Sequence, residues 1–196
     1  MAILTGPEIR KQYGLGKINI DPWVDEHVGP ASVDLRLHPD LLVYEQFLVL
    51  HEQRQWRVTE RGAWQRQVDL DMRKDNPTVK LTIPDEGLVL RPGILYLGRT
   101  VESVSSDRFV PQVTGRSSVG RLGVQIHETA GYIDPGFDGT ITLEIRVVHP
   151  IRVYAGECVC QVFFTRSEGD EQLYEGRYQK QVDPTASRFH LQDGEW

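Results

Sequence analysis

Short runs of alternating apolar and polar residues, separated by turns rich in Pro and Gly, make up most of the sequence and most constrain its fold. In the run 31–37, Val33, Leu35 and Leu37 alternate with polar residues, as in a strand with one buried face. Many short strands with turns at intervals of roughly 8–12 residues are typical of an all-β barrel or sandwich. The same pattern predicts further strands at 41–47, 67–72, 78–83, 88–90, 94–100 and 140–146.

Two segments favour a helix instead. Thr5-Gly-Pro-Glu8 has the spacing of a capping box with proline in the first turn, and Gly14 is a natural stop. A helix is therefore predicted over 6–13. Residues 117–122 lack strand alternation and are predicted to form about one helical turn.

The 196 residues are predicted to form a single domain, 1–196, because no repeat or linker divides them. Residues 53–67 are polar with two tryptophans and are interpreted as an excursion at the edge of the sheet. The polar tail after Ser167 has little capacity to form a core.

Charge and cysteine content exclude several classes of protein. A net charge of −6 argues against a general nucleic-acid or membrane-surface binder, so an anionic ligand would need a local basic cluster. Cys158 and Cys160 are interpreted as small buried hydrophobic residues in a reducing compartment. No signal peptide and no apolar run of about 20 residues is evident, so a cytoplasmic protein is expected.

The segment Gly115-Arg-Ser-Ser-Val-Gly-Arg121 has the residue types of a phosphate site. Glycine permits close backbone approach, serine hydroxyls and amides at a helix start suit an anion, and arginine forks match phosphate oxygens. A P-loop is excluded, because Arg121-Leu122 stands where Lys-Ser/Thr is required. A capped surface helix with solvated arginines remains the alternative.

A turn and a strand follow this segment. Pro-Gly and Asp-Gly within 133–139 are standard turn formers. In the strand 140–146, Thr142 and Glu144 share one face with Thr140 and Arg146, while three apolar residues point to the core. The polar face is either a site or merely solvated.

No metal-binding motif is complete. His127-Glu128 begins like the zinc-protease motif, but Gly131 stands where the second His is required. Cys158 and Cys160 are one residue apart, whereas zinc deaminases use Cys-x-x-Cys. No metal site is therefore predicted, and His127 is interpreted as a hydrogen-bonded structural residue.

Taken in order, several segments carry a family likeness. The chain resembles the dCTP deaminases, relatives of the trimeric dUTPases. The matching segments are Pro30–Leu37, Leu90–Gly93, Gly115–Gly123, His127–Phe137, Thr142–Glu144, Gln161–Phe164 and Tyr178–Arg188.

This resemblance implies a mainly β fold, a distorted β-barrel of the dUTPase-like type with short helices. It implies a homotrimer with sites between subunits and a C-terminal tail, about 168–196, that closes over the site. The implied reaction is hydrolytic deamination of dCTP to dUTP and ammonia without a cofactor. Mg²⁺ accompanies the triphosphate, and dUTP and dTTP are further ligands.

The resemblance also implies roles for single residues. Glu144 is expected to be the general base, and Ser117, Arg121 and Asp134 to act with it in catalysis. The remaining residues expected to bind substrate are Arg116, Ser118, Val119, Gly120, Thr142, Leu143, Tyr174, Arg177 and Gln181.

Two alternatives stay open beside the deaminase that stops at dUTP. Gly131 followed by an aromatic residue, and Gly120, resemble bifunctional members that also cleave dUTP to dUMP and pyrophosphate. In these, Asp134 would activate the water that attacks the α-phosphate. Arg177 stands where the family often has lysine, which leaves its role open. The second alternative is a nucleotide-binding trimer without catalysis.

Overall fold

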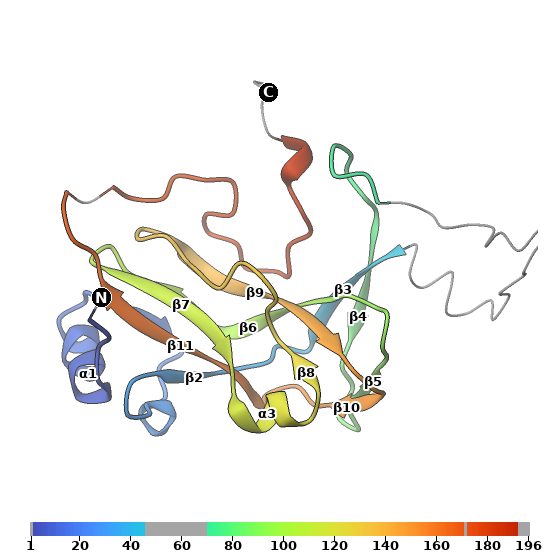
Figure 1. Ribbon diagram of the computed structural model, residues 1–196, viewed down its shortest axis with the longest axis horizontal. Helices are drawn as coiled ribbons and strands as arrows, with labels where there is room; N and C mark the ends of the chain where they lie inside the picture. Colours follow the sequence, from blue (N-terminus) through green and yellow to red (C-terminus); the bar gives the residue numbers. More distant parts are fainter. Residues whose placement is uncertain (1, 46–69, 171, 192–196) are drawn as a thin grey trace, which may run out of the picture.

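The computed structural model describes residues 2–45, 70–170 and 172–191 and is mainly β (Figure 1). Its helices are α1 (Gly6–Gly14), η1 (Asp25–His27), α3 (Ser117–Arg121) and η2 (Phe189–Leu191). The strands are β1 (Asn19–Asp21), β2 (Val33–Arg36), β3 (Asp40–Tyr44), β4 (Thr78–Thr82), β5 (Leu88–Leu90), β6 (Tyr96–Ser105), β7 (Phe109–Gly115), β8 (Val124–Gln125), β9 (Asp138–Val147), β10 (Ile151–Val153) and β11 (Cys158–Arg166).

The described strands form three antiparallel sheets. The largest runs in the order β4-β3-β6-β9-β8, with β1 added to β6. A second sheet has the order β2-β11-β7, and β5 pairs with β10 in a third. Figure 1 shows α1 at one edge, α3 at the bottom and the C-terminal tail across the top. Strand β9 therefore lies between β6 and the short β8, with the tail above it.

The core lies between the inward faces of these sheets. Leu35 of β2, Leu143 of β9 and Phe164 of β11 are fully buried, and they belong to one cluster of apolar side chains. Burying each such side chain stabilises the fold by about 1.5–3 kcal/mol. The apolar positions of the alternating runs thus supply the core, as the sequence pattern predicts.

Both predicted helices form. Helix α1 ends at Gly14, as expected, but the side chain of Thr5 makes no capping hydrogen bond. The capping-box prediction is wrong because Glu8 Oε1 instead accepts a hydrogen bond from Gln12 Nε2, one turn along the helix, at 2.7 Å. Helix α3 occupies the predicted turn at 117–122.

The predicted strands are mostly confirmed, with one error. Strand β6 extends five residues beyond the predicted end at 100. Residues 70–72, the described part of the predicted strand 67–72, form no strand. There Asn76 donates a side-chain hydrogen bond to the Asp71 carbonyl and accepts one from the Asp71 amide, which closes a turn. Residues 46–47, at the end of one predicted strand, and the predicted excursion 53–67 lie outside the described residues.

Both cysteines are free thiols, as expected. Cys160 is fully buried, whereas Cys158 is half-buried, because a bulge in β11 between them shifts the pairing with β2. No helix in the described part of the chain is long and apolar enough to span a membrane.

Candidate active site

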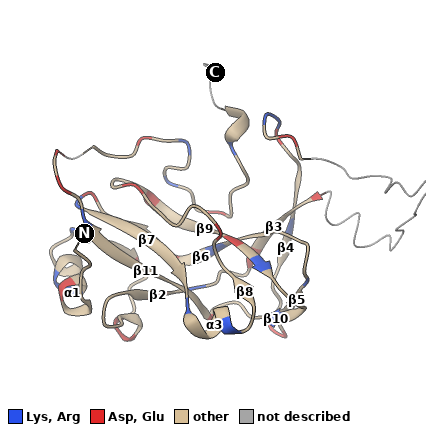
Figure 2. Ribbon diagram, viewed as in Figure 1, with Lys and Arg blue, Asp and Glu red and all other residues tan. Residues whose placement is uncertain are grey.

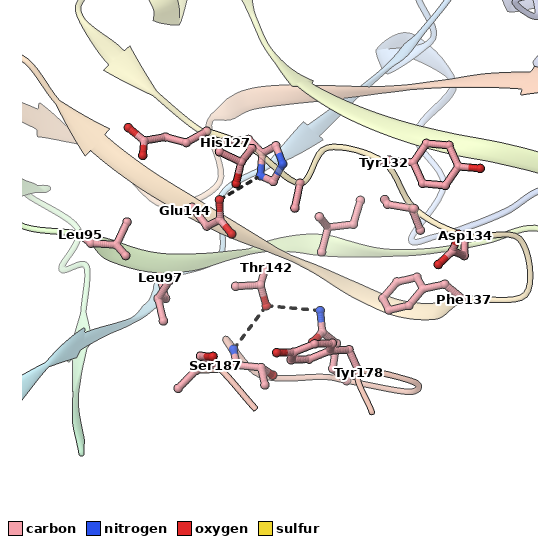
Figure 3. Close-up of a pocket in the computed structure, with 18 of the residues that line it drawn as sticks. Leu95, Leu97, His127, Tyr132, Asp134, Phe137, Thr142, Glu144, Tyr178 and Ser187 are labelled. Atoms are coloured by element: carbon pink, nitrogen blue, oxygen red, sulfur yellow. Dashed lines mark hydrogen bonds and ion pairs between the residues drawn. The ribbon is translucent and has the colours of Figure 1, made fainter. Parts of the chain in front are cut away.

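A cavity of about 580 Å³ opens between β9, the segment 127–137 and the tail. Figure 3 shows side chains from these three parts pointing into it, with Glu144 and Thr142 on β9 and Tyr178 and Ser187 on the tail. The lining includes three carboxylates, those of Glu128, Asp134 and Glu144. A volume of this size suits a small organic ligand.

The alternation of β9 directs Thr142 and Glu144 into the cavity. Leu143 and Ile145, their neighbours in sequence, are buried in the core on the opposite face. Packing on that face makes the strand a rigid support for the Glu144 carboxylate, whose side chain is one-third exposed. Leu143 was among the residues expected to bind substrate, but its side chain is buried in the core and does not line the cavity.

Thr140 is buried rather than solvated, because the tail covers this end of β9. Its amide donates to the Gln181 carbonyl at 3.0 Å, and its hydroxyl donates to the Val182 carbonyl at 3.1 Å. Gln181 Nε2 donates to the Thr140 carbonyl at 2.7 Å and approaches Thr142 Oγ1 at 3.3 Å. The tail thus pairs with this end of β9 through backbone and side-chain hydrogen bonds.

The segment 127–134 forms the second wall and is held on β7. The Val113 amide donates to the Gly131 carbonyl at 2.8 Å, and the Ile133 amide donates to the Pro111 carbonyl at 3.0 Å. This docking presents Asp134 at the cavity, at the start of the predicted turn, where Gly136 adopts a positive φ of 85°. Asp134 and Glu144 thereby line one cavity from two separate segments.

His127 lies beside Glu144 in the same wall. Its Nδ1 is 3.7 Å from Glu144 Oε2, and its side chain is one-tenth exposed. Neither ring nitrogen has a hydrogen-bond partner among the described residues. The interpretation as a hydrogen-bonded structural residue is therefore wrong as to the hydrogen bond.

The tail supplies the third wall. Tyr174 packs its ring against Phe137, with centroids 6.1 Å apart, and its amide donates to the Pro135 carbonyl at 2.8 Å. Arg177 does not line the cavity; its Nη1 donates to the carbonyl of Arg188 at 2.8 Å. Of the predicted tail residues, Tyr174 and Gln181 face the cavity.

The predicted phosphate-binding segment lies elsewhere in the subunit. Arg116 Nη2 pairs with Asp34 at 3.0 Å, and Arg116 Nη1 donates to the Cys158 carbonyl at 3.0 Å. Other predicted residues of this segment, Ser117, Ser118, Gly120 and Arg121, are exposed, and Val119 packs against the core. Three members, Arg116, Ser118 and Val119, line a separate cavity of about 230 Å³.

Charge divides the two regions. The described residues that line the larger cavity include three carboxylates and neither lysine nor arginine. In Figure 2, α3 with its basic residue lies at the bottom of the view, whereas the tail runs across the top. Among the described residues that line the larger cavity, a highly charged anion would therefore find neither lysine nor arginine.

Comparison with known proteins places this architecture. Residues 3–167 match the model of a family described as dCTP deaminase-like. The chain belongs to the dCTP deaminase-like family. It is 47% identical over 178 residues to the dUMP-forming dCTP deaminase of Leptospira biflexa, which covers 90% of each chain. The enzyme of the same name from Clostridium acetobutylicum is 43% identical over 186 residues, or 93% of this chain and 95% of that one.

A solved structure supports the fold of this dCTP deaminase-like chain. The 2′-deoxycytidine 5′-triphosphate deaminase from Agrobacterium tumefaciens superposes with a TM-score of 0.57 at 24% identity. The match covers 84% of this chain and about half, 48%, of that longer chain. The family assignment expected from the sequence, an enzyme of the dCTP deaminase type, is confirmed.

The sequence reasoning missed several cavity residues of this dCTP deaminase-like chain. They come from β3, from β6 and the residue before it, and from the tail: Tyr44, Leu95, Leu97, Tyr178, Thr185 and Ser187. Tyr44 Oη accepts a hydrogen bond from the Ser187 amide at 3.2 Å, which ties the tail to β3. Nothing in the local pattern around residue 44 indicates this contact, because it joins residues 143 positions apart.

Proposed function

We propose that this chain hydrolyses dCTP to dUMP, ammonia and pyrophosphate, by deamination of the base and cleavage between the α- and β-phosphates. The observation that carries the proposal is the presence of Glu144 and Asp134, two carboxylates from separate segments, in one cavity. The relatives at 42–47% identity are named dCTP deaminase, dUMP-forming. They favour the bifunctional alternative over the enzyme that stops at dUTP.

In the proposed deamination, Glu144 is the general base. It takes a proton from water as the water oxygen bonds to C4 of cytosine and the C4=N3 double bond opens, and this proton passes to N3. It then carries the proton of the new C4 hydroxyl to N4, so that the C4–N4 bond breaks, the C4 carbonyl forms and ammonia leaves. Positioned proton transfer of this kind contributes about 10²–10⁴-fold to a rate, so orientation and preorganised donors must supply the rest. The rigid support of β9 under Glu144 favours such orientation.

In the proposed second step, Asp134 orients the water that attacks the α-phosphate. Attack there forms a bond from the α-phosphorus to the water oxygen, whose proton passes to Asp134. The bond from the α-phosphorus to the bridging oxygen breaks, and pyrophosphate leaves with that oxygen. Asp134 is exposed at the turn before β9, next to Pro135, whose carbonyl accepts a hydrogen bond from the amide of the tail residue Tyr174. Because both carboxylates line one cavity, one bound nucleotide would present its base to Glu144 and its α-phosphate to Asp134.

We further propose that the active unit is a homotrimer of distorted β-barrels with sites shared between subunits. In support, the described residues that line the cavity with Glu144 include no lysine or arginine, while Ser117, Ser118 and Arg121 are exposed on α3. A neighbouring subunit can bring these residues to the triphosphate. Arg116 and the tail residue Arg177 would complete the phosphate contacts.

Magnesium is proposed to arrive with the triphosphate. Mg²⁺ is commonly bound through one or two carboxylates plus substrate phosphates. Among the described residues no group of three or more His, Cys, Asp or Glu could form a protein cage for it. Phosphate oxygens would then be the main ligands, and the ion would offset their charge. The proposed setting is the cytoplasm, whose reducing conditions suit the free thiols of Cys158 and Cys160.

The test is a product analysis on dCTP with ammonia detection and ion-exchange separation of nucleotides. Wild type should yield ammonia, dUMP and pyrophosphate. Glu144→Gln should yield none, and Asp134→Asn should release ammonia but accumulate dUTP. Asp85→Asn, the same chemical change on an exposed turn outside both cavities, is the control and should match wild type.

Four outcomes would contradict parts of the proposal. A Glu144→Gln variant with a near wild-type rate would show that Glu144 is not the general base. An Asp134→Asn variant that still forms dUMP would show that Asp134 has no role in the second step. Wild type that binds dCTP in calorimetry but forms no product over hours identifies a nucleotide-binding protein instead. Sedimentation of the active protein as a monomer would remove the shared site.

A further inference from the structure

The His127 ring is a buried polar group that the described residues leave unsatisfied. Its side chain is one-tenth exposed, and neither Nδ1 nor Nε2 has a hydrogen-bond partner there. Leaving a buried polar group unpaired costs about 1–3 kcal/mol, so folded proteins retain few such groups. Because this cost lowers stability, we expect the ring to have a function at this position that offsets it.

The pairing of β8 with β9 sets the ring against Glu144. Val124 pairs with Val147, and Gln125 pairs with Arg146. Continuing this antiparallel register by two residues places His127 opposite Glu144, on the same face of the sheet. The side chains meet accordingly, with Nδ1 at 3.7 Å from Oε2, as the dashed line in Figure 3 marks.

Gly131 holds the ring from the other side. A Cβ at this position would lie 3.2 Å from His127 Cδ2 and 3.5 Å from Nε2. It would also lie 2.6 Å from the Val113 carbonyl oxygen, closer than real Cβ atoms approach. The missing side chain therefore lets the ring rest against the backbone at 131, with Nδ1 directed at Glu144.

We propose that His127 is a positioning residue for Glu144, donating its Nδ1–H to Oε2 so that Oε1 faces the water and the base. This inference rests on the proposed function. The 3.7 Å separation exceeds a hydrogen bond, but contacts of catalytic groups are often long without ligand and tighten in the complex. The Glu144 carboxylate has no other hydrogen bond or ion pair within the described residues, so this donor decides which carboxylate oxygen is available.

The chemistry of the pair is suited to a base that must stay ionised. A neutral imidazole with its proton on Nδ1 stabilises a carboxylate without adding a full charge beside it. When Glu144 takes a proton from water, Oε1 receives it while Oε2 remains oriented by the ring. Loss of comparable orienting partners elsewhere costs about 10–100-fold in activity.

Two amide substitutions separate positioning from packing. Asn places its Nδ2 donor near the position of His Nδ1, whereas Gln places its Nε2 donor near the position of His Nε2. His127→Asn should therefore retain kcat within about threefold, while His127→Gln and His127→Leu should lower kcat about 10–100-fold with KM nearly unchanged. Gln125→Leu, an exposed change on the same face of β8, is the control and should match wild type.

Equal kcat in all three His127 variants, equal losses in His127→Asn and His127→Gln, or a loss confined to KM would each overturn the positioning role. A wild-type protein that releases no ammonia from dCTP instead overturns the proposed function. In that case, or if the His127 variants fail to fold, NMR tests the contact between His127 and Glu144 without any need for turnover. ¹⁵N NMR of wild type should find the His127 proton on Nδ1, and Glu144→Ala should shift this resonance. A proton on Nε2, or a resonance indifferent to Glu144→Ala, overturns the pair.

Discussion

Replacing Gly131 by Ala tests how closely the cavity wall is packed. The added Cβ would lie 2.6 Å from the Val113 carbonyl oxygen, and ordinary contact begins at 3.4 Å, so the two must separate by about 0.8 Å. The backbone at 131 would have to move, although its carbonyl accepts a 2.8 Å hydrogen bond from the Val113 amide. The substitution therefore strains the same contact that docks this segment on β7.

The energetic cost follows from these contacts. Overpacking by one methyl group in a tight site costs about 1–3 kcal/mol, and weakening one hydrogen bond adds about 0.5–1.5 kcal/mol. The lower entropy of the unfolded chain with Ala returns about 0.4–1 kcal/mol. The central values of these ranges leave a net loss of about 2 kcal/mol, which for a chain of this length lowers Tm by roughly 4–8 °C.

The assay is thermal unfolding by circular dichroism at one fixed protein concentration, with kcat for dCTP measured in parallel. Gly14→Ala is the matched control, because a Cβ at the end of α1 would meet nothing within 4 Å. Its Tm should stay within about 2 °C of wild type, in line with the small effect of surface substitutions. If Gly131→Ala has the same Tm and kcat as wild type, residue 131 is not packed closely against Val113. The packing of the His127 ring against the backbone at 131 would then be refuted as well.

Three further predictions concern charge and thiol chemistry away from the cavity. The buried Glu102 carboxylate accepts a hydrogen bond from Arg36 Nε at 2.6 Å, so Glu102→Ala would leave the arginine without its partner and should lower the free energy of unfolding in urea by about 3 kcal/mol. An unchanged urea midpoint would refute this. Burial and the Arg99 guanidinium lower the pKa of His38, so the unfolded chain binds more protons near the ordinary His value of 6.5. Stability should be fully present above that value and fall as pH drops through and below it, with a smaller slope in His38→Gln between pH 5 and 8. Burial raises the pKa of the Cys160 thiol far above its ordinary value, so a disulfide reagent should label it only after unfolding, and rapid labelling of the native protein would contradict the buried position.

The residues of β9 show how far local pattern carries a prediction. Thr142 and Glu144 alternate with apolar neighbours, and the strand directs them away from the core as that alternation predicts. For Thr140 the alternation left open whether the polar face is a site or is solvated. The tail covers this residue, whose hydroxyl donates hydrogen bonds to carbonyls about 40 positions away.

Sequence alone determined the mainly β architecture, the helical turns at both predicted places and the family, along with Glu144 as the outward-facing carboxylate of its strand. These features depend on neighbours along the chain, through side-chain period, turn chemistry and ordered motifs. Only the tertiary structure decided that β8 pairs with β9 in the register that opposes His127 to Glu144, and that α3 lies apart from the cavity of its own chain. Register and docking are set by contacts between distant segments, and the local period of a strand contains no information about which residue lies across from it.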